Sequence, residues 1–135
     1  MSVGRRNNVK VQGQGAGCLV FAHGFGCDQN MWRLLAPRYA ARCRTITFDM
    51  VGSGLSDLGA YDPGKYASLH GYADDVLEII DEFAHGPVVF VGHSVGAMIG
   101  LLAGVHRPGR IAGHVMVGPS PCYIDDGDYV GGFSR

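Results

Sequence analysis

The stretch FVGHSVGAM, residues 90–98, decides how the rest of this sequence is interpreted. A run of valine and phenylalanine ends here, and one serine, Ser94, stands between two glycines, Gly92 and Gly96. The apolar run before it favours a buried strand, and the residues after it favour a helix that opens at once. G-x-S-x-G at such a junction is typical of a nucleophile elbow, whose sharp turn strains the serine backbone and needs glycine on both sides. We therefore predict that Ser94 is a catalytic nucleophile.

The overall composition indicates one globular domain. The chain has 135 residues, of which 47% are hydrophobic and 17% charged, and its net charge is −1. Because no basic field exists, neither nucleic acid nor an anionic membrane is expected as a partner. The N-terminus lacks the apolar core of a secretory signal, and no apolar run approaches the roughly 18 residues of a membrane span. We expect a cytoplasmic protein.

The residues that could bind metals are not spaced as ligands. The four cysteines show no CxxC pattern, and we interpret them as buried free thiols. The six histidines form no HxH or HxxxH pair. We predict no metal and no cofactor.

Short apolar runs alternate with stretches of helical periodicity, which is typical of an α/β fold with a parallel sheet and right-handed crossovers. The glycines at positions 96, 100 and 104 recur every four residues, which favours close packing of a helix on the sheet. Residues 120–135 are expected to be a loop. The predicted strands are residues 9–11, 18–22, 45–48, 88–91 and 112–117, and the predicted helices are residues 28–41, 69–84 and 95–106.

Two further stretches follow predicted strands. An oxyanion hole needs two backbone N–H groups aimed at one point, and in an elbow one comes from the residue after the nucleophile, here Val95. The segment HGFG, residues 23–26, would supply the second from Phe25, although a plain glycine turn would also explain it. We interpret His23 as structural. Asp49, at the start of a glycine-rich turn, is interpreted as scaffold that binds nearby N–H groups.

The general base that a serine nucleophile needs cannot be found in the expected chain order of Ser, Asp or Glu, then His. Only His106 and His114 follow Ser94. His106 lies at the far end of the predicted helix, about 18 Å away at 1.5 Å per residue. His114 is placed at the beginning of the last strand, and the acidic residues 125, 126 and 128 come after it. The triad Asp and His are therefore not present in this chain.

Five ordered blocks resemble the RsbQ-like family of bacterial α/β-hydrolases, to which the plant karrikin and strigolactone receptors are similar. The resemblance runs from residue 6 to residue 133; one departure is His70, where the family tends to carry Asp. The blocks are HGFGCDQNMW (23–32), FDMVGSGLSD (48–57), YASLHGYADDV (66–76), FVGHSVGAMIGLLA (90–103) and MVGPSPCYIDDGDYVGGF (116–133).

The resemblance implies a Ser-Asp-His hydrolase with a small apolar pocket under a helical lid, and a role in stress-response signalling with a partner phosphatase. Carried over by position, Ser94 is the nucleophile, and Phe25 and Val95 are the oxyanion donors. The family's lid, Asp and His lie beyond the matched region. We therefore expect residues 1–135 to be the N-terminal part of a single α/β-hydrolase domain, truncated before the lid and inactive alone.

Two classes of function stay open. The first is an esterase-like hydrolase of a small apolar compound, and the second is a small-molecule sensor in which hydrolysis is incidental. A cofactor-free haloperoxidase or another esterase of the same fold is disfavoured by the FGCDQ and GPSPCY segments.

Overall fold

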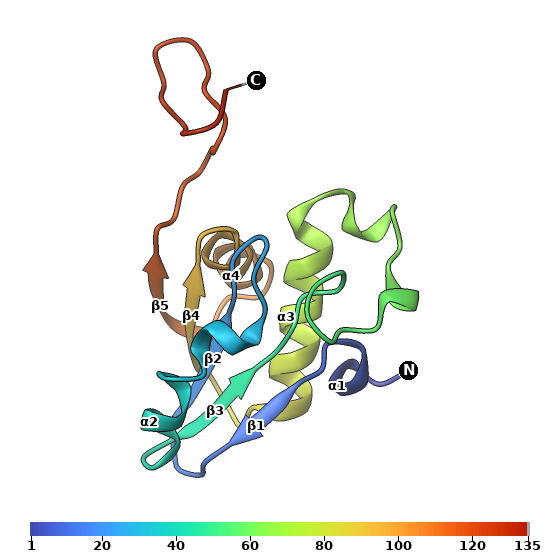
Figure 1. The fold of residues 1–135 in the computed structure, drawn as a ribbon. Helices are drawn as coiled ribbons and strands as arrows, with labels where there is room; N and C mark the ends of the chain where they lie inside the picture. The colour runs from blue at the N-terminus through green and yellow to red at the C-terminus, as the bar shows by residue number, and fades with distance from the viewer. Residues whose placement is uncertain (135) are drawn as a thin grey trace.

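Five strands form one sheet in the computed structural model, which describes residues 1–134 (Figure 1). Their order is β1-β3-β2-β4-β5, and the last four are mutually parallel. The α/β fold with a parallel sheet is thus confirmed. The strands are β1 (Lys10–Gln12), β2 (Cys18–Ala22), β3 (Arg44–Thr47), β4 (Val88–His93) and β5 (Ile111–Val117).

The edge strand β1 differs from the rest, because it runs antiparallel to β3. It therefore also runs opposite to β2, which follows it after only residues 13–17. A parallel connection needs a crossover of a dozen or more residues, so this short link has to reverse the chain. Gly13 and Gly15 make the reversal with φ of 73° and 146°.

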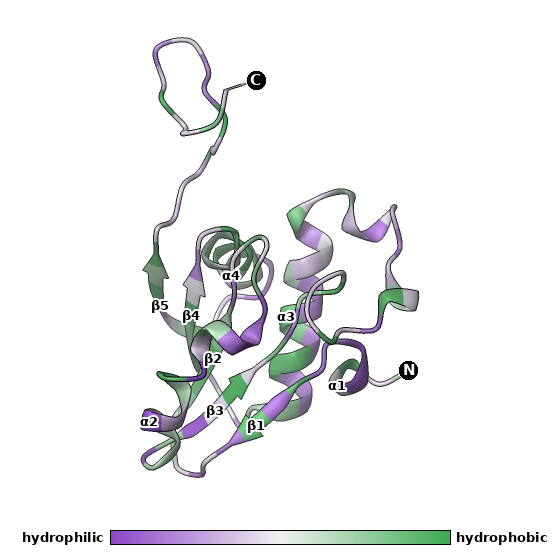
Figure 2. Ribbon diagram, in the orientation of Figure 1, coloured by the Kyte–Doolittle hydropathy of each residue, from purple (hydrophilic) through white to green (hydrophobic). Residues whose placement is uncertain are grey.

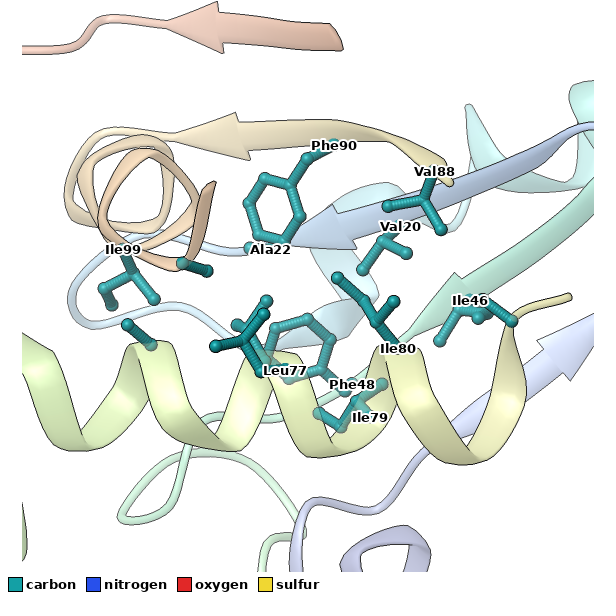
Figure 3. Close-up of a cluster of buried hydrophobic side chains, with 14 of the residues drawn as sticks. Val20, Ala22, Ile46, Phe48, Leu77, Ile79, Ile80, Val88, Phe90 and Ile99 are labelled. Carbon is teal, nitrogen blue, oxygen red and sulfur yellow. The ribbon is translucent and has the colours of Figure 1, made fainter. Parts of the chain in front are cut away.

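One face of the sheet is covered by helices α3 (Leu69–Phe83) and α4 (Val95–His106) and the short α1 (Val3–Arg6). Alternate strand residues such as Val20, Ile46 and Phe90 point toward α3, from which Ile80 extends toward them (Figure 3). Val76 of α3 belongs to the same cluster. All five are at most 1% exposed, so this layer is the main core.

Helix α4 begins and ends where the sequence predicts, and α3 ends one residue early. Its N-cap residue, Ser68, makes no side-chain capping bond. Close packing of α4 on the sheet is confirmed, because a Cβ on Gly100 would lie 2.2 Å from the Phe90 ring.

The helix predicted over residues 28–41 is wrong. The structure has instead a 3-10 helix η1 (Gln29–Trp32) and a separate short helix α2 (Ala36–Ala40) on the other face of the sheet. Asp28 caps the first, accepting a bond from the Asn30 N–H at 2.7 Å. Pro37 stands in the first turn of the second. Proline lacks the N–H of a helix interior and its ring clashes with the preceding turn, so one continuous helix cannot form.

Residues 49–67 form turns with two 3-10 segments, η2 (Leu58–Ala60) and η3 (Lys65–Ala67). Beyond β5, residues 118–134 extend away from the sheet as a loop of mixed hydropathy, as predicted (Figures 1 and 2). No helix within residues 1–134 combines the length and apolar character needed to cross a membrane.

The four cysteines are all free, but they are not all buried. Cys18 lies in the core, and burial raises the pKa of its thiol. Cys27 and Cys43 are half-buried. The prediction of buried thiols is wrong for Cys122, which is exposed because it lies on the loop beyond β5.

Candidate active site

Ser94 lies at the turn between β4 and α4 with φ 53° and ψ −123°. Asn8 is the only other non-glycine residue within residues 1–134 with positive φ. This backbone conformation lies outside the regions that L-residues favour, and such strain is concentrated at functional sites. The predicted strain at Ser94 is therefore present in the structure.

The glycines on either side of Ser94 are required by close backbone approaches. A Cβ on Gly92 would lie 2.5 Å from the Cα of Ala97, and a Cβ on Gly96 would lie 2.3 Å from the carbonyl oxygen of His23. Backbone atoms cannot turn aside as a flexible side chain can. The turn consequently has the geometry of a nucleophile elbow.

The serine is tied to the sheet through its backbone and not through its side chain. Its N–H donates to the carbonyl of Val117, at the end of β5, over 2.8 Å. Within residues 1–134 its hydroxyl has no hydrogen-bond partner. Nothing in this part of the chain therefore activates the hydroxyl for attack.

His23 holds two loops together beneath the elbow. Its side chain is 1% exposed, and its Nε2 accepts a hydrogen bond from the Met50 N–H at 3.0 Å. The proton must then be on Nδ1, which lies 2.8 Å from the Gly24 carbonyl and donates to it. Both ring nitrogens are occupied, so His23 is unavailable as a base and has the structural position that we expected.

The two expected oxyanion donors line one cavity of about 280 Å³. Within residues 1–134 neither the Phe25 N–H nor the Val95 N–H donates a backbone hydrogen bond. Val95 is the first residue of α4, where the free amides and the helix dipole favour negative charge. The structure thus brings Phe25 and Val95 to a common space, while their role as donors to an oxyanion stays a prediction.

Asp49 is buried and fully engaged with the loops around it. Its carboxylate accepts bonds from the N–H groups of Gln29 and Leu55 and from the Asn8 side chain, over 2.8–3.0 Å. Burial disfavours its charged form, but these hydrogen bonds outweigh burial and hold the pKa of Asp49 below its usual value. Asp49 has the contacts of a scaffold residue.

The two histidines that follow Ser94 both lie elsewhere in the fold. His106 ends α4, and its Nε2 lies 2.8 Å from Nδ1 of the exposed His70. His114 was expected at the beginning of the last strand but is the fourth residue of β5, because the strand begins at Ile111. It faces α4, and burial lowers its pKa. No complete triad forms within residues 1–134.

Three residues at the site carry no motif that would have marked them. Tyr61 and Tyr72 line the cavity from a loop and from α3, and the sequence pattern places Tyr72 among core residues. His93 packs against the loop at residues 23–26, since a Cβ on Gly24 would lie 2.5 Å from its Nδ1. No sequence signal points to Tyr61 or Tyr72 in advance, and His93 is marked only as a variable position of the G-x-S-x-G pattern.

A strained serine between two obligatory glycines, at the carboxyl end of a parallel strand and the start of a helix, defines an α/β-hydrolase. A model of the alpha/beta hydrolase family matches residues 19–134. The chain belongs to this family.

Similar proteins include plant receptors and enzymes. The chain is 43% identical to karrikin insensitive 2 receptor CA of Petunia hybrida, covering 96% of this chain and 48% of the receptor. It is 40% identical to strigolactone esterase D14 of Arabidopsis thaliana, covering 95% of this chain and 48% of that protein. The resemblance to these receptor hydrolases is confirmed.

Among solved structures, a hydrolase from Oleispira antarctica superimposes with a TM-score of 0.91 at 46% identity. The match covers 98% of this chain and 49% of the hydrolase. The chain spans about half the length of the curated relatives it matches.

Proposed function

We propose that the protein is a serine hydrolase of the RsbQ type that cleaves a small apolar ester or related carbonyl compound. The observation that carries the proposal is the strained Ser94 beside one cavity that both Phe25 and Val95 line. The cavity's side chains are mostly apolar, which favours a substrate of the same character.

In the proposed reaction, the Ser94 oxygen attacks the carbonyl carbon and the carbonyl electrons move to the oxygen. The Phe25 and Val95 N–H groups donate to that oxyanion. Collapse of the tetrahedral intermediate expels the alcohol, and water then releases the acid from the acylated serine. The base that takes the serine proton and the carboxylate that orients it would come from outside residues 1–134. Residues 1–135 alone would then hydrolyse no ester.

The proposed cellular role is stress-response signalling with a partner phosphatase, which would place the protein in the cytoplasm. This part rests on the resemblance to the RsbQ-like family alone.

A second candidate is a small-molecule sensor with incidental hydrolysis. The sequence identity of 43% with a protein named as a karrikin insensitive 2 receptor favours this candidate. In a sensor, the cavity would bind a ligand whose main effect is to change a contact with a partner.

The test uses the protein as the cell makes it and p-nitrophenyl acetate as substrate. An esterase turns the ester over, and Ser94→Ala lowers kcat by at least about a thousandfold. Turnover that persists in Ser94→Ala would contradict the proposal. Ligand-dependent thermal stabilisation without turnover would favour the sensor.

A further inference from the structure

The cavity beside the elbow extends away from the two expected oxyanion donors as an apolar chamber. From Phe25 and Val95 it continues between the loop at residues 50–53 and the beginnings of α3 and α4. Its volume of about 280 Å³ is near the lower end for small-molecule sites, roughly 300–1,000 Å³. Its lining there includes Val51, Leu69 and Ile99.

Two tyrosines form one wall of this chamber, which we call the tyrosine wall: Tyr61 from the loop before η3 and Tyr72 from α3. A third ring, Tyr66, contacts both. Its centroid lies 5.5 Å from that of Tyr61, nearly parallel at 21°, and 4.7 Å from that of Tyr72. Such offset ring contacts fix the relative positions of aromatic side chains.

Tyr66 is itself anchored from behind. It is 6% exposed, and its hydroxyl donates to Oδ2 of Asp75 over 2.9 Å. The other carboxylate oxygen of Asp75 pairs with Arg6 at 2.8 Å and Lys65 at 2.6 Å. The tyrosine wall therefore packs on Tyr66, which the buried Asp75 and its two ion pairs hold in place. The positions of the wall's rings are thus fixed before any ligand binds.

The chemistry decides which part of an ester such a chamber would hold. The alcohol must depart and water must take its place, so the leaving group needs an open path. The acyl part stays attached to Ser94 through both steps. An apolar chamber that begins at the proposed oxyanion donors is therefore suited to hold the acyl part of the ester.

We propose that this chamber is the acyl subsite, with Tyr61 and Tyr72 as the residues that set the length of an apolar acyl chain. This inference rests on the proposed function. It assigns the substrate class as esters of short, apolar carboxylic acids.

The experiment measures kcat/KM of the protein as the cell makes it for p-nitrophenyl acetate, butyrate and octanoate. Tyr61→Ala opens the chamber and should raise the octanoate-to-butyrate ratio by about tenfold or more, the scale of one or two methylenes in an apolar pocket. Leu69→Trp fills it and should lower the butyrate-to-acetate ratio by a similar factor. Tyr39→Ala is the matched control, since Tyr39 is similarly exposed but lies on α2, across the sheet; its ratios should not change.

A second series varies the alcohol, as the acetates of ethanol, butanol and octanol, with acid release as the readout. Its selectivity should be unaffected by Tyr61→Ala. A shift in this series in place of the acyl series, or no shift in either, would overturn the inference.

Two results would contradict the proposed function without deciding the acyl subsite: turnover that does not depend on Ser94, or no turnover at all. Binding of 2-butanone, 2-hexanone and 2-octanone then tests the chamber without chemistry. A chain-length preference that moves in Tyr61→Ala and not in Tyr39→Ala supports the chamber as an apolar ligand site. The same preference in both variants and the wild type overturns it.

Discussion

The backbone conformation of Ser94 is unfavourable in free energy for any residue with a Cβ, but not for glycine. Its φ of 53° and ψ of −123° place the side chain where an L-residue is crowded, at a cost of about 1–3 kcal/mol. The cost is tolerated because it lifts the hydroxyl out of the sheet at the start of α4. The hydroxyl has no hydrogen bond within residues 1–134 to offset it.

Ser94→Gly should therefore be more stable than Ser94→Ala by about 1 kcal/mol, after allowing about 0.5–1 kcal/mol for the greater unfolded-state freedom of glycine. Urea unfolding of the two variants measures the difference. Ser53 gives the matched control, because its φ is not positive and its hydroxyl is unbonded within residues 1–134. There glycine should be the less stable of the two. If Ser94→Gly were less stable than Ser94→Ala by the same margin as at Ser53, the elbow would store no strain.

Asp49 should give the protein a stability that depends on pH. Its pKa in the folded state lies below its ordinary value, so the ionised form favours folding. The contribution is complete above the unfolded pKa of about 4 and is lost as the pH falls through the lower folded value. In urea unfolding from pH 7 to pH 3, the stability difference between wild type and Asp49→Asn should shrink as the pH falls. A constant difference would show that the hydrogen bonds do not depend on the charge.

At the scale of elements, Asp75 joins α1, η3 and α3. Its side chain is 2% exposed and contacts the side chains of Arg6, Lys65 and Tyr66. Burial and the negative charge of Asp75 raise the pKa of Tyr66, which keeps the phenol a hydrogen-bond donor. Glu78 also pairs with Arg6, at 3.0 Å, but is 48% exposed.

Asp75→Asn should destabilise the protein by about 3 kcal/mol, because two partly buried cations lose their carboxylate. Glu78→Gln, which removes an exposed partner of the same cations, should cost less than about 1 kcal/mol. Chemical denaturation of both variants provides the comparison. Similar losses in the two would indicate that the buried position of Asp75 contributes nothing beyond an ordinary surface pair.

Elements with strong local signals could be predicted from the sequence, and those decided by contacts distant in the chain could not. Helix α4 was bounded correctly because Ser94 opens it and a proline follows it. The single helix predicted over residues 28–41 does not form, because Pro37 interrupts the apolar spacing that predicts it. The direction of β1 was missed because three residues carry no signal of pairing, although the short link to β2 requires a reversal.

The candidate site divides in the same way. The elbow could be predicted because its glycines and serine are close in sequence and each has a steric reason. The tyrosine wall could not, because Tyr61 and Tyr72 approach the loop at residues 23–26 only after α3 packs on the sheet. Tyr72 fits the apolar spacing of an ordinary core face of the helix, and Tyr61 lies in a loop with no such pattern.

For the molecule as a whole, the two faces of the sheet differ in how fully they are covered. The face toward α3 and α4 is buried, whereas η1 and α2 cover only part of the other. That other face has an apolar hollow of about 190 Å³, whose lining includes Leu19, Phe21, Val89, Val91 and Val115. At the edge, Val115 and Val117 of β5 are 49% and 47% exposed. An open, apolar strand edge is a site of association.

A polypeptide of residues 1–135 should accordingly bind a hydrophobic dye and sediment above its 14.3 kDa mass at micromolar concentration. Val115→Lys with Val117→Lys should suppress both effects, because charge on an edge strand opposes pairing with another chain. Val130→Lys is the control, since Val130 is 84% exposed but lies on the loop beyond β5 and should leave association unchanged. Suppression by the control as well would trace association to overall charge and not to the β5 edge. A monomeric wild-type polypeptide that binds no dye would contradict the prediction that the β5 edge is a site of association.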